Sequence, residues 1–347
     1  MDKNNFWNNH TLNDFQQLAI FKNVHSHQIT SVCFLKDGRI ASSSGDNKVL
    51  IYNKNTFKIE IKIKEKKEIN YMNINKDGIL ITCLGGTCLN LYEIKGKIYK
   101  NIQTIKPYNL LLDIIGEFDD SFSIQKFNEL KNGDIAILVW ADALSFYKKE
   151  KNSKKYSFLN KFKLKRNENI TDLCEWDDKQ YCIAFEFNKL IKFLDWNKKA
   201  ITSIIKFDKN FSFSDSKNQL LLMNKNDLFV IGQNNLIIID IKNKEIIKNI
   251  KIVLSGYLSS IYKLSENILI AGFWRNNIGQ FEYDENKKDI KLISKIGQKW
   301  SSSVIFDVSS ISILNNNLIV TPYNNDLSNS SLIIYKLKNR LYKIPLL

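Results

Sequence analysis

The sequence predicts an all-β fold built from repeated copies of one small antiparallel unit. The segment 25–53 holds three short alternating apolar runs separated by turn residues. Its Lys-Asp-Gly turn, residues 36–38, returns as residues 76–78 inside a second copy of the unit. Glycine adopts a positive φ without steric cost, so each of these turns favours a β-hairpin. Three short strands cannot bury a face alone, so the unit is expected to stack against its copies.

The first two units define the pattern of strands. Strands are expected at 29–34, 39–42 and 49–52 in the first unit, with a second turn at 45–48. The second unit has matching runs at 69–74, 79–82 and 89–92. A further alternating run at 58–63 follows the first unit. The period-two alternation of these runs is typical of half-buried strands.

The same rhythm continues to the end of the chain. A large apolar or aromatic residue recurs on the third strand at intervals of 40 to 55 residues, near the ~40–45 typical of such repeats. The seven positions are Tyr52, Tyr92, Tyr147, Phe193, Ile239, Phe281 and Tyr335. Seven units account for nearly all of the 347 residues. This favours one closed ring over two domains, because a ring leaves no end unit unpaired.

The first unit resembles one WD repeat. In that family a His, a Ser or Thr, an Asp and an aromatic residue form a hydrogen-bonded network, and the matching residues here are His25, Ser42, Asp46 and Tyr52. The resemblance implies a fourth, outer strand in each unit, which the run 58–63 supplies. We therefore expect an all-β, seven-bladed β-propeller of four-stranded antiparallel blades over residues 16–347, after a polar tail at 1–15. Fold alone does not decide function.

Two segments compete to be the outer strand of the last blade. One is 18–22, contributed by the beginning of the chain, and the other is 341–344. Pro345 follows the second segment and marks it as an edge or tail, because proline cannot donate a ladder hydrogen bond. The N-terminal segment is the preferred interpretation.

Composition limits the classes of function. The formal net charge is +15, which is compatible with nucleic-acid or acidic-membrane binding. Only four of the 51 basic residues are Arg, however, and Arg is the preferred residue for bidentate phosphate contacts. No apolar run is long enough to cross a membrane, and the start lacks the apolar segment of a secretory signal. Five cysteines without a CxxC pair favour a reducing, cytoplasmic setting.

Catalysis and metal binding find little support in the sequence. His25, Ser42 and Asp46 are the residue types of a hydrolase triad, but they fall on the structural positions of the WD repeat. His10 and His27 have no companion ligand at metal-binding spacing. We expect no enzyme activity, no metal and no cofactor.

A lysine-rich segment, 147–166, lies between the third and outer strands of the third blade. It carries nine basic residues and one acidic residue. A solvated edge that resists strand pairing is one interpretation, and a site for phosphate groups is the other. The candidate anion-binding residues are Lys148, Lys149, Lys151, Lys154, Lys155 and Arg166.

Large aromatic residues and an Arg gather at the second turns and at the segments that lead into each blade. These turns and segments share one rim, and Trp, Tyr and Arg are enriched among binding hot spots. Packing within the propeller is the alternative role. The candidate partner-binding residues are Trp140, Tyr257, Phe273, Trp274, Arg275, Trp300 and Tyr323, the last at the start of a long loop, 323–330.

The pattern as a whole favours a non-catalytic protein-interaction scaffold or adaptor in the cytoplasm, with one or more proteins as partners. The alternative is a basic propeller that binds RNA or anionic phosphate groups through the lysine-rich hairpin. Binding of nucleic acid with a steep salt dependence would distinguish the second from the first.

Overall fold

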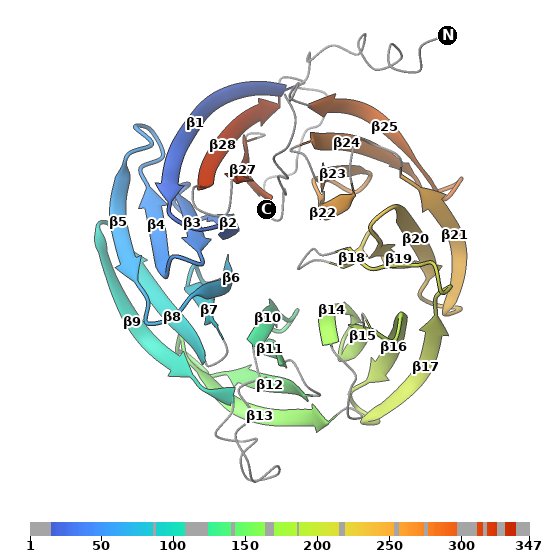
Figure 1. Ribbon diagram of the computed structural model, residues 1–347. Helices are drawn as coiled ribbons and strands as arrows, with labels where there is room; N and C mark the ends of the chain where they lie inside the picture. Colours follow the sequence, from blue (N-terminus) through green and yellow to red (C-terminus); the bar gives the residue numbers. More distant parts are fainter. Residues whose placement is uncertain are drawn as a thin grey trace, which may run out of the picture.

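The computed structural model describes residues 15–85, 88–107, 124–139, 143–163, 170–185, 187–214, 219–252, 257–273, 277–296, 311–314, 318–324 and 330–337. The named elements in these residues are 28 strands, which form seven four-stranded antiparallel sheets. The sheets follow one another around a central axis as the blades of a propeller, with the first strand of each blade innermost (Figure 1). The predicted fold class is confirmed.

Each of the first four blades is built from four consecutive strands. Blade 1 consists of β2 (Ile29–Phe34), β3 (Ile40–Ser44), β4 (Lys48–Tyr52) and β5 (Ile59–Lys64). Blade 2 consists of β6 (Ile69–Ile74), β7 (Leu80–Leu84), β8 (Cys88–Lys95) and β9 (Ile98–Ile105). Blade 3 consists of β10 (Ile124–Glu129), β11 (Ile135–Val139), β12 (Ala143–Lys149) and β13 (Tyr156–Lys163). Blade 4 consists of β14 (Ile170–Asp177), β15 (Gln180–Phe185), β16 (Leu190–Asp195) and β17 (Ala200–Lys206).

The last three blades include the one that closes the ring. Blade 5 consists of β18 (Leu220–Leu222), β19 (Asp227–Ile231), β20 (Asn235–Asp240) and β21 (Glu245–Lys251). Blade 6 consists of β22 (Leu258–Lys263), β23 (Ile268–Phe273), β24 (Asn277–Asp284) and β25 (Asp289–Ile296). Blade 7 combines β26 (Ser312–Leu314), β27 (Leu318–Asn324) and β28 (Ser330–Leu337) with β1 (Phe15–His25) as its outer strand. The N-terminal segment therefore closes the ring, as the sequence favoured, and 341–344 lie outside the described residues.

Burial explains the different sequence patterns of the strands. The second strands, such as β7 and β11, are buried along their whole length and read as nearly continuous apolar runs. The outer strand β5 alternates, with Ile61 and Ile63 buried and Lys62 and Lys64 exposed. The core is divided into clusters that lie between neighbouring blades, for example one that joins residues of blades 1 and 2. Each blade thus buries its faces against the next blade, which is why one unit alone could not fold.

The first turns adopt the predicted backbone conformation. Gly38, Gly78 and Gly133 have φ values of 84°, 84° and 87°, in the left-handed region that favours glycine. At the other end of the inner strands, five blades share a register shift of one residue, a β-bulge. In blade 1, the side chain just after the bulge forms a hydrogen bond with the next blade: Ser31 Oγ accepts the amide hydrogen of Met72 at 3.0 Å. The inner strands are thereby tied together around the axis.

Candidate interaction surface

The four residues matched to the WD-repeat network form one chain of hydrogen bonds. His25 Nε2 lies 2.8 Å from Ser42 Oγ, and His25 Nδ1 lies 3.1 Å from Asp46 Oδ1. Ser42 Oγ lies 3.2 Å from the hydroxyl of Tyr52. His25 is the last residue of β1, so the network joins the outer strand of blade 7 to blade 1. It fastens the ring where its first and last blades meet.

The environment of Ser42 argues for a structural role and against nucleophilic catalysis. Its side chain is 0% exposed and is bonded to both His25 and Tyr52. A nucleophile has to reach its substrate, which this hydroxyl cannot do. Asp46 also accepts hydrogen bonds from the Ser26 amide and from Lys48. Burial alone would raise the pKa of Asp46, but His25 and Lys48 outweigh it and hold that pKa well below its usual range.

Blade 2 contains a second hydrogen-bonded network, which was not predicted from the sequence. Glu65 stands four residues before β6, as His25 stands four residues before β2. Its buried carboxylate accepts hydrogen bonds from Thr82 at 2.8 Å, Tyr92 at 2.9 Å and Asn90 at 2.8 Å. Thr82 and Tyr92 are the register counterparts of Ser42 and Tyr52. The equal spacing of His25 and Glu65 from their inner strands could have indicated this network in the sequence. The match was not recognised because Glu replaces His at this position.

We call the rim that bears the turns between second and third strands the second-turn rim. It also carries the segments that lead into each blade, because backbone hydrogen bonds join the two: Gly45 to Gln28, and Gln233 to Ser212. Of the predicted partner-binding residues, Tyr257 lies on this rim and is 44% exposed. Trp140, Trp274, Arg275 and Trp300 lie outside the described residues.

The structure corrects one rim assignment and one loop boundary. Phe273 is the last residue of β23, pairs with Leu258 and Asn277, and is 0% exposed. It belongs to the core between blades 5 and 6, so it cannot contact a partner. Tyr323 lies within β27 opposite Ser331, so it does not begin the loop that leads to β28. Both errors arose because the turns were placed by residue type and the strands run further than expected.

Phe187 is an exposed rim residue outside the set predicted from the sequence. It lies in the second turn of blade 4, between β15 and β16, and its side chain is 66% exposed. Hydrogen bonds link its turn along the rim: Phe207 donates to Lys189, Gln233 donates to Ser212, and Leu258 donates to Gln233. Phe187 and Tyr257 are therefore held on one connected stretch of blades 4 to 6. The sequence did contain an indication of this exposed residue, because the second turn of blade 1 has small and polar residues where blade 4 has Phe187.

Aromatic side chains pack beneath this stretch. Phe207, Phe211 and Phe213 pack against one another with ring centroids 4.6 to 5.6 Å apart. Gly232, in the second turn of blade 5, lies directly against this cluster. A Cβ atom there would come within 2.7 Å of the Phe211 ring. The absence of a side chain at Gly232 lets the aromatic cluster support the rim.

The lysine-rich hairpin lies on the opposite rim, between β12 and β13 of blade 3. Two of its lysines are bound to acidic residues of blade 2: Lys149 pairs with Asp77, and Lys154 pairs with Glu93 at 2.6 Å. Hydrogen bonds from Lys154 lower the pKa of Glu93. Lys148, Lys151 and Lys155 are exposed, whereas Arg166 lies outside the described residues. The hairpin therefore uses part of its charge to hold two blades together.

Within the described part of the chain, no group of three or more His, Cys, Asp or Glu residues is arranged to hold a metal ion. No disulfide joins the five cysteines, and burial raises the pKa of Cys33 and of Cys174 to about 12. None of the described segments forms a helix that is long and apolar enough to cross a membrane.

Comparison with solved structures supports the propeller architecture. The WD40 repeats of RRP9 superpose with a TM-score of 0.69 at 12% identity, covering 95% of this chain and 99% of that chain. The WD40 β-propeller domain of Doa1 gives a TM-score of 0.66 at 12% identity, covering 94% and 98%. A streptogramin B lyase gives 0.66 at 12% identity with the same coverage. No protein-family model and no curated protein matches the sequence. The chain thus has a propeller fold that WD40-repeat domains share with a lyase.

Proposed function

We infer that this protein is a non-catalytic interaction scaffold that binds a partner protein through the second-turn rim of blades 4 to 6. The observation that carries the inference is the exposure of two large aromatic side chains, Phe187 at 66% and Tyr257 at 44%, on one supported stretch of that rim. Exposed aromatic residues on a rigid frame bind with little loss of conformational entropy. The WD40 domains of similar fold support a binding role, while the similar lyase keeps the enzyme alternative open to test.

The lysine-rich hairpin is not included in this binding surface. Lys149 and Lys154 already have carboxylate partners within the protein, which reduces the charge available to an external phosphate.

The test is a comparison of partners captured from cells of origin by the parent and by a Phe187→Ser/Tyr257→Ser variant. We expect the variant to fold with an unchanged melting temperature and to bind its main protein partner at least about tenfold more weakly. Ile98→Ser is the matched control, because Ile98 is 75% exposed but lies on the hairpin of blade 2. Equal partner affinity in the parent and the double variant would place the binding surface elsewhere.

A further inference from the structure

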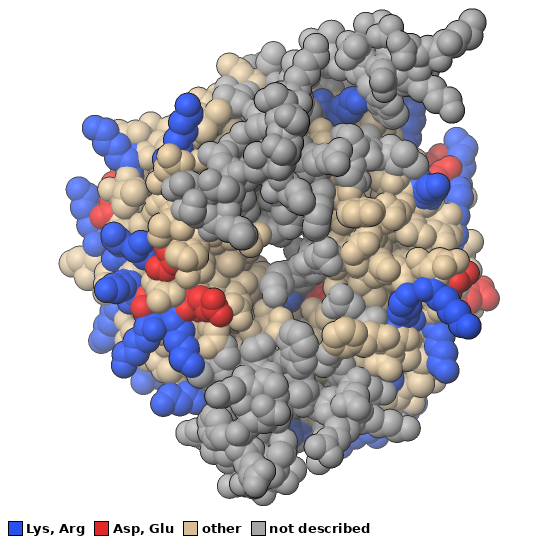
Figure 2. All heavy atoms as spheres, viewed as in Figure 1, with Lys and Arg blue, Asp and Glu red and all other residues tan. Residues whose placement is uncertain are grey.

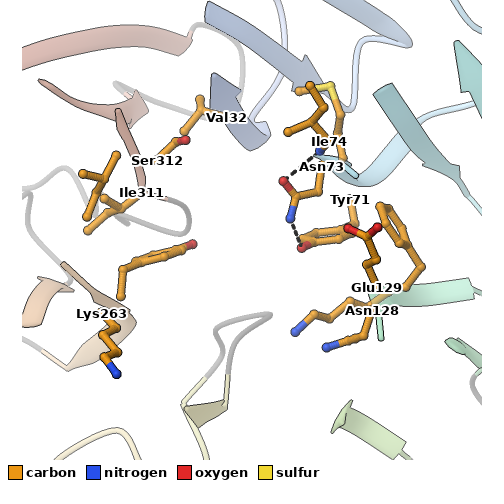
Figure 3. A pocket seen from close by; sticks show the side chains of 14 residues that line it. Val32, Tyr71, Asn73, Ile74, Asn128, Glu129, Lys263, Ile311 and Ser312 are labelled. Atoms are coloured by element: carbon orange, nitrogen blue, oxygen red, sulfur yellow. Dashed lines mark hydrogen bonds between the residues drawn. The ribbon is translucent and has the colours of Figure 1, made fainter. Parts of the chain in front are cut away.

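The axis of the propeller contains two adjoining cavities of about 470 Å³ each. They share five lining residues, Lys126, Asn128, Glu129, Tyr262 and Lys263. A space-filling view shows an opening near the centre of the ring (Figure 2). In the first cavity, side chains from β6 and β10 face side chains from β22 and β26 across the space (Figure 3). The wall therefore combines groups from distant parts of the sequence.

Four lysines line the second cavity, and three of them, Lys76, Lys131 and Lys263, form no salt bridge with a carboxylate within the described residues. Lys76 Nζ donates to the carbonyl oxygens of Leu130 and Lys131, at 3.3 and 3.1 Å. Lys131 Nζ donates to the carbonyl oxygen of Trp176 at 3.0 Å. Lys263 Nζ donates to that of Met223 at 2.5 Å. These acceptors are neutral, and an ammonium group has three hydrogens, so donor capacity remains at each lysine.

Two acidic groups of the same wall, Glu129 and Glu175, are stabilised by the charges of Lys76 and Lys131, but they accept their hydrogen bonds from backbone amides. Glu129 accepts the backbone amide of Lys76 at 2.8 Å, and Glu175 accepts that of Lys131 at 2.5 Å. Burial raises the pKa of both carboxyl groups. Lys126 is a different case, because its ammonium lies 2.6 Å from Asp172, with both side chains buried. The border of the second cavity thus carries the ammonium groups of Lys76, Lys131 and Lys263 against two carboxyl groups, those of Glu129 and Glu175, so ammonium groups are in excess.

Asn128 adds a second requirement for a ligand. Its side-chain amide donates to the carbonyl oxygen of Leu173 at 2.8 Å, whereas its Oδ1 is buried and has no hydrogen-bond partner. A buried acceptor without a donor is costly, and a bound hydroxyl group would satisfy it. Asn128 borders both cavities, beside Glu129.

We propose that the axial cavities bind a phosphorylated polyol, with its phosphate groups on Lys76, Lys131 and Lys263 and a hydroxyl group on Asn128. Phosphate oxygens suit ammonium donors, and the hydroxyl groups of the polyol supply the hydrogen that Asn128 Oδ1 lacks. Each cavity, at about 470 Å³, lies within the ~300–1,000 Å³ that is typical of small-molecule sites. This site is separate from the second-turn rim, so its test does not depend on whether the proposed scaffold function is correct.

The experiment is titration calorimetry of the full chain with myo-inositol hexakisphosphate at physiological salt, with sulfate as the simple anion. We expect saturable binding of the phosphorylated polyol and at least tenfold weaker binding to Lys131→Met/Lys263→Met. Should the double variant fail to fold, Lys263→Gln replaces it in the test. This variant keeps a hydrogen-bond donor for the carbonyl oxygen of Met223 but lacks the positive charge, so it should also bind the phosphorylated polyol more weakly. The control is Lys148→Met/Lys151→Met, which removes two exposed charges from the hairpin of blade 3.

The same variants distinguish the source of the phosphate. Binding of the soluble ester, without binding of vesicles that contain a phosphoinositide, would support the site and assign a free metabolite. Vesicle binding that the cavity variants abolish would support the site and assign a lipid headgroup. Absence of binding to both probes, or binding that only the hairpin control weakens, would overturn the proposal.

Discussion

At the scale of single residues, the two networks next to blades 1 and 2 show how one position can be filled by different chemistry. His25 bonds through its two ring nitrogens to Ser42 and Asp46. Glu65 occupies the same place in blade 2 and accepts three hydrogen bonds. The position thus requires a buried polar group that can join the inner turn to the second and third strands, and it does not require histidine.

Removal of the histidine should destabilise the fold measurably. His25→Ala leaves Asp46 without its ring donor and Ser42 with Tyr52 as its remaining side-chain partner, which should cost about 1–3 kcal/mol in free energy of unfolding. His27→Ala is the control, because His27 is exposed two residues away. Urea unfolding of both variants measures the difference. Equal midpoints would show that the network contributes nothing to stability.

The lowered pKa of Asp46 predicts a dependence of stability on pH. In the unfolded chain an aspartate takes up its proton near pH ~3.9, whereas the folded state resists protonation to lower pH. The contribution of Asp46 is therefore complete above that pH and is lost as the pH falls towards the folded pKa. Unfolding midpoints of the parent and of Asp46→Asn should converge below about pH 4. A constant difference from pH 7 to pH 2 would contradict this assignment.

At the scale of strands and turns, neighbouring blades are joined by a repeated contact. A residue at or near the end of an inner strand bonds to the first turn of the preceding blade. Glu129 and Glu175 do so as acceptors of backbone amides, and Lys263 does so as a donor to a carbonyl oxygen. Sequence alone could not reveal this contact, because it depends on the relative placement of two blades.

Blades 5 and 6 are joined by a buried charge that offers a matched test. Asp227, with a side chain 1% exposed, is held by Lys288 at 2.8 Å and by the Tyr283 hydroxyl at 2.7 Å. Lys288→Met leaves this carboxylate without a cation and should cost roughly 2 kcal/mol or more. Lys287→Met is the control, because Lys287 pairs with Asp284 on the exposed surface and should not shift the midpoint. Equal effects in thermal unfolding would show that the inter-blade pair is as weak as a surface pair.

At the scale of the whole molecule, the seven-bladed ring could be predicted from the sequence, whereas the residues exposed on its surfaces could not. Alternation and the spacing of third strands predicted seven blades, because each blade repeats the same burial pattern. Phe273 was misplaced, since an aromatic residue next to a turn can end a buried strand as well as form the turn. The pairing of Lys149 with Asp77 was also missed, because these residues meet only when adjacent blades pack. Contacts within a blade were thus predictable, whereas these contacts between blades were not; the His25 network, which the WD-repeat resemblance marked, is an exception.

Closure of the ring by β1 gives the last prediction. β1 pairs with β28, and Ala19, Phe21 and Val24 pack on the core between blades 7 and 1. A chain that begins at Ser26 loses this strand together with His25, and leaves the edge of β28 unpaired. We expect it to lose more than ~3 kcal/mol of stability and to associate through the open edge. A chain that begins at Phe15 retains β1 and is the control.

Addition of a synthetic peptide of residues 15–25 should restore the melting temperature of the shortened chain, because the peptide can pair with the free edge of β28. Thermal unfolding with and without the peptide, together with light scattering, measures both effects. If the chain that begins at Ser26 unfolded at the same temperature as the control, β1 would be dispensable and the ring would be held closed by packing of the inner strands alone.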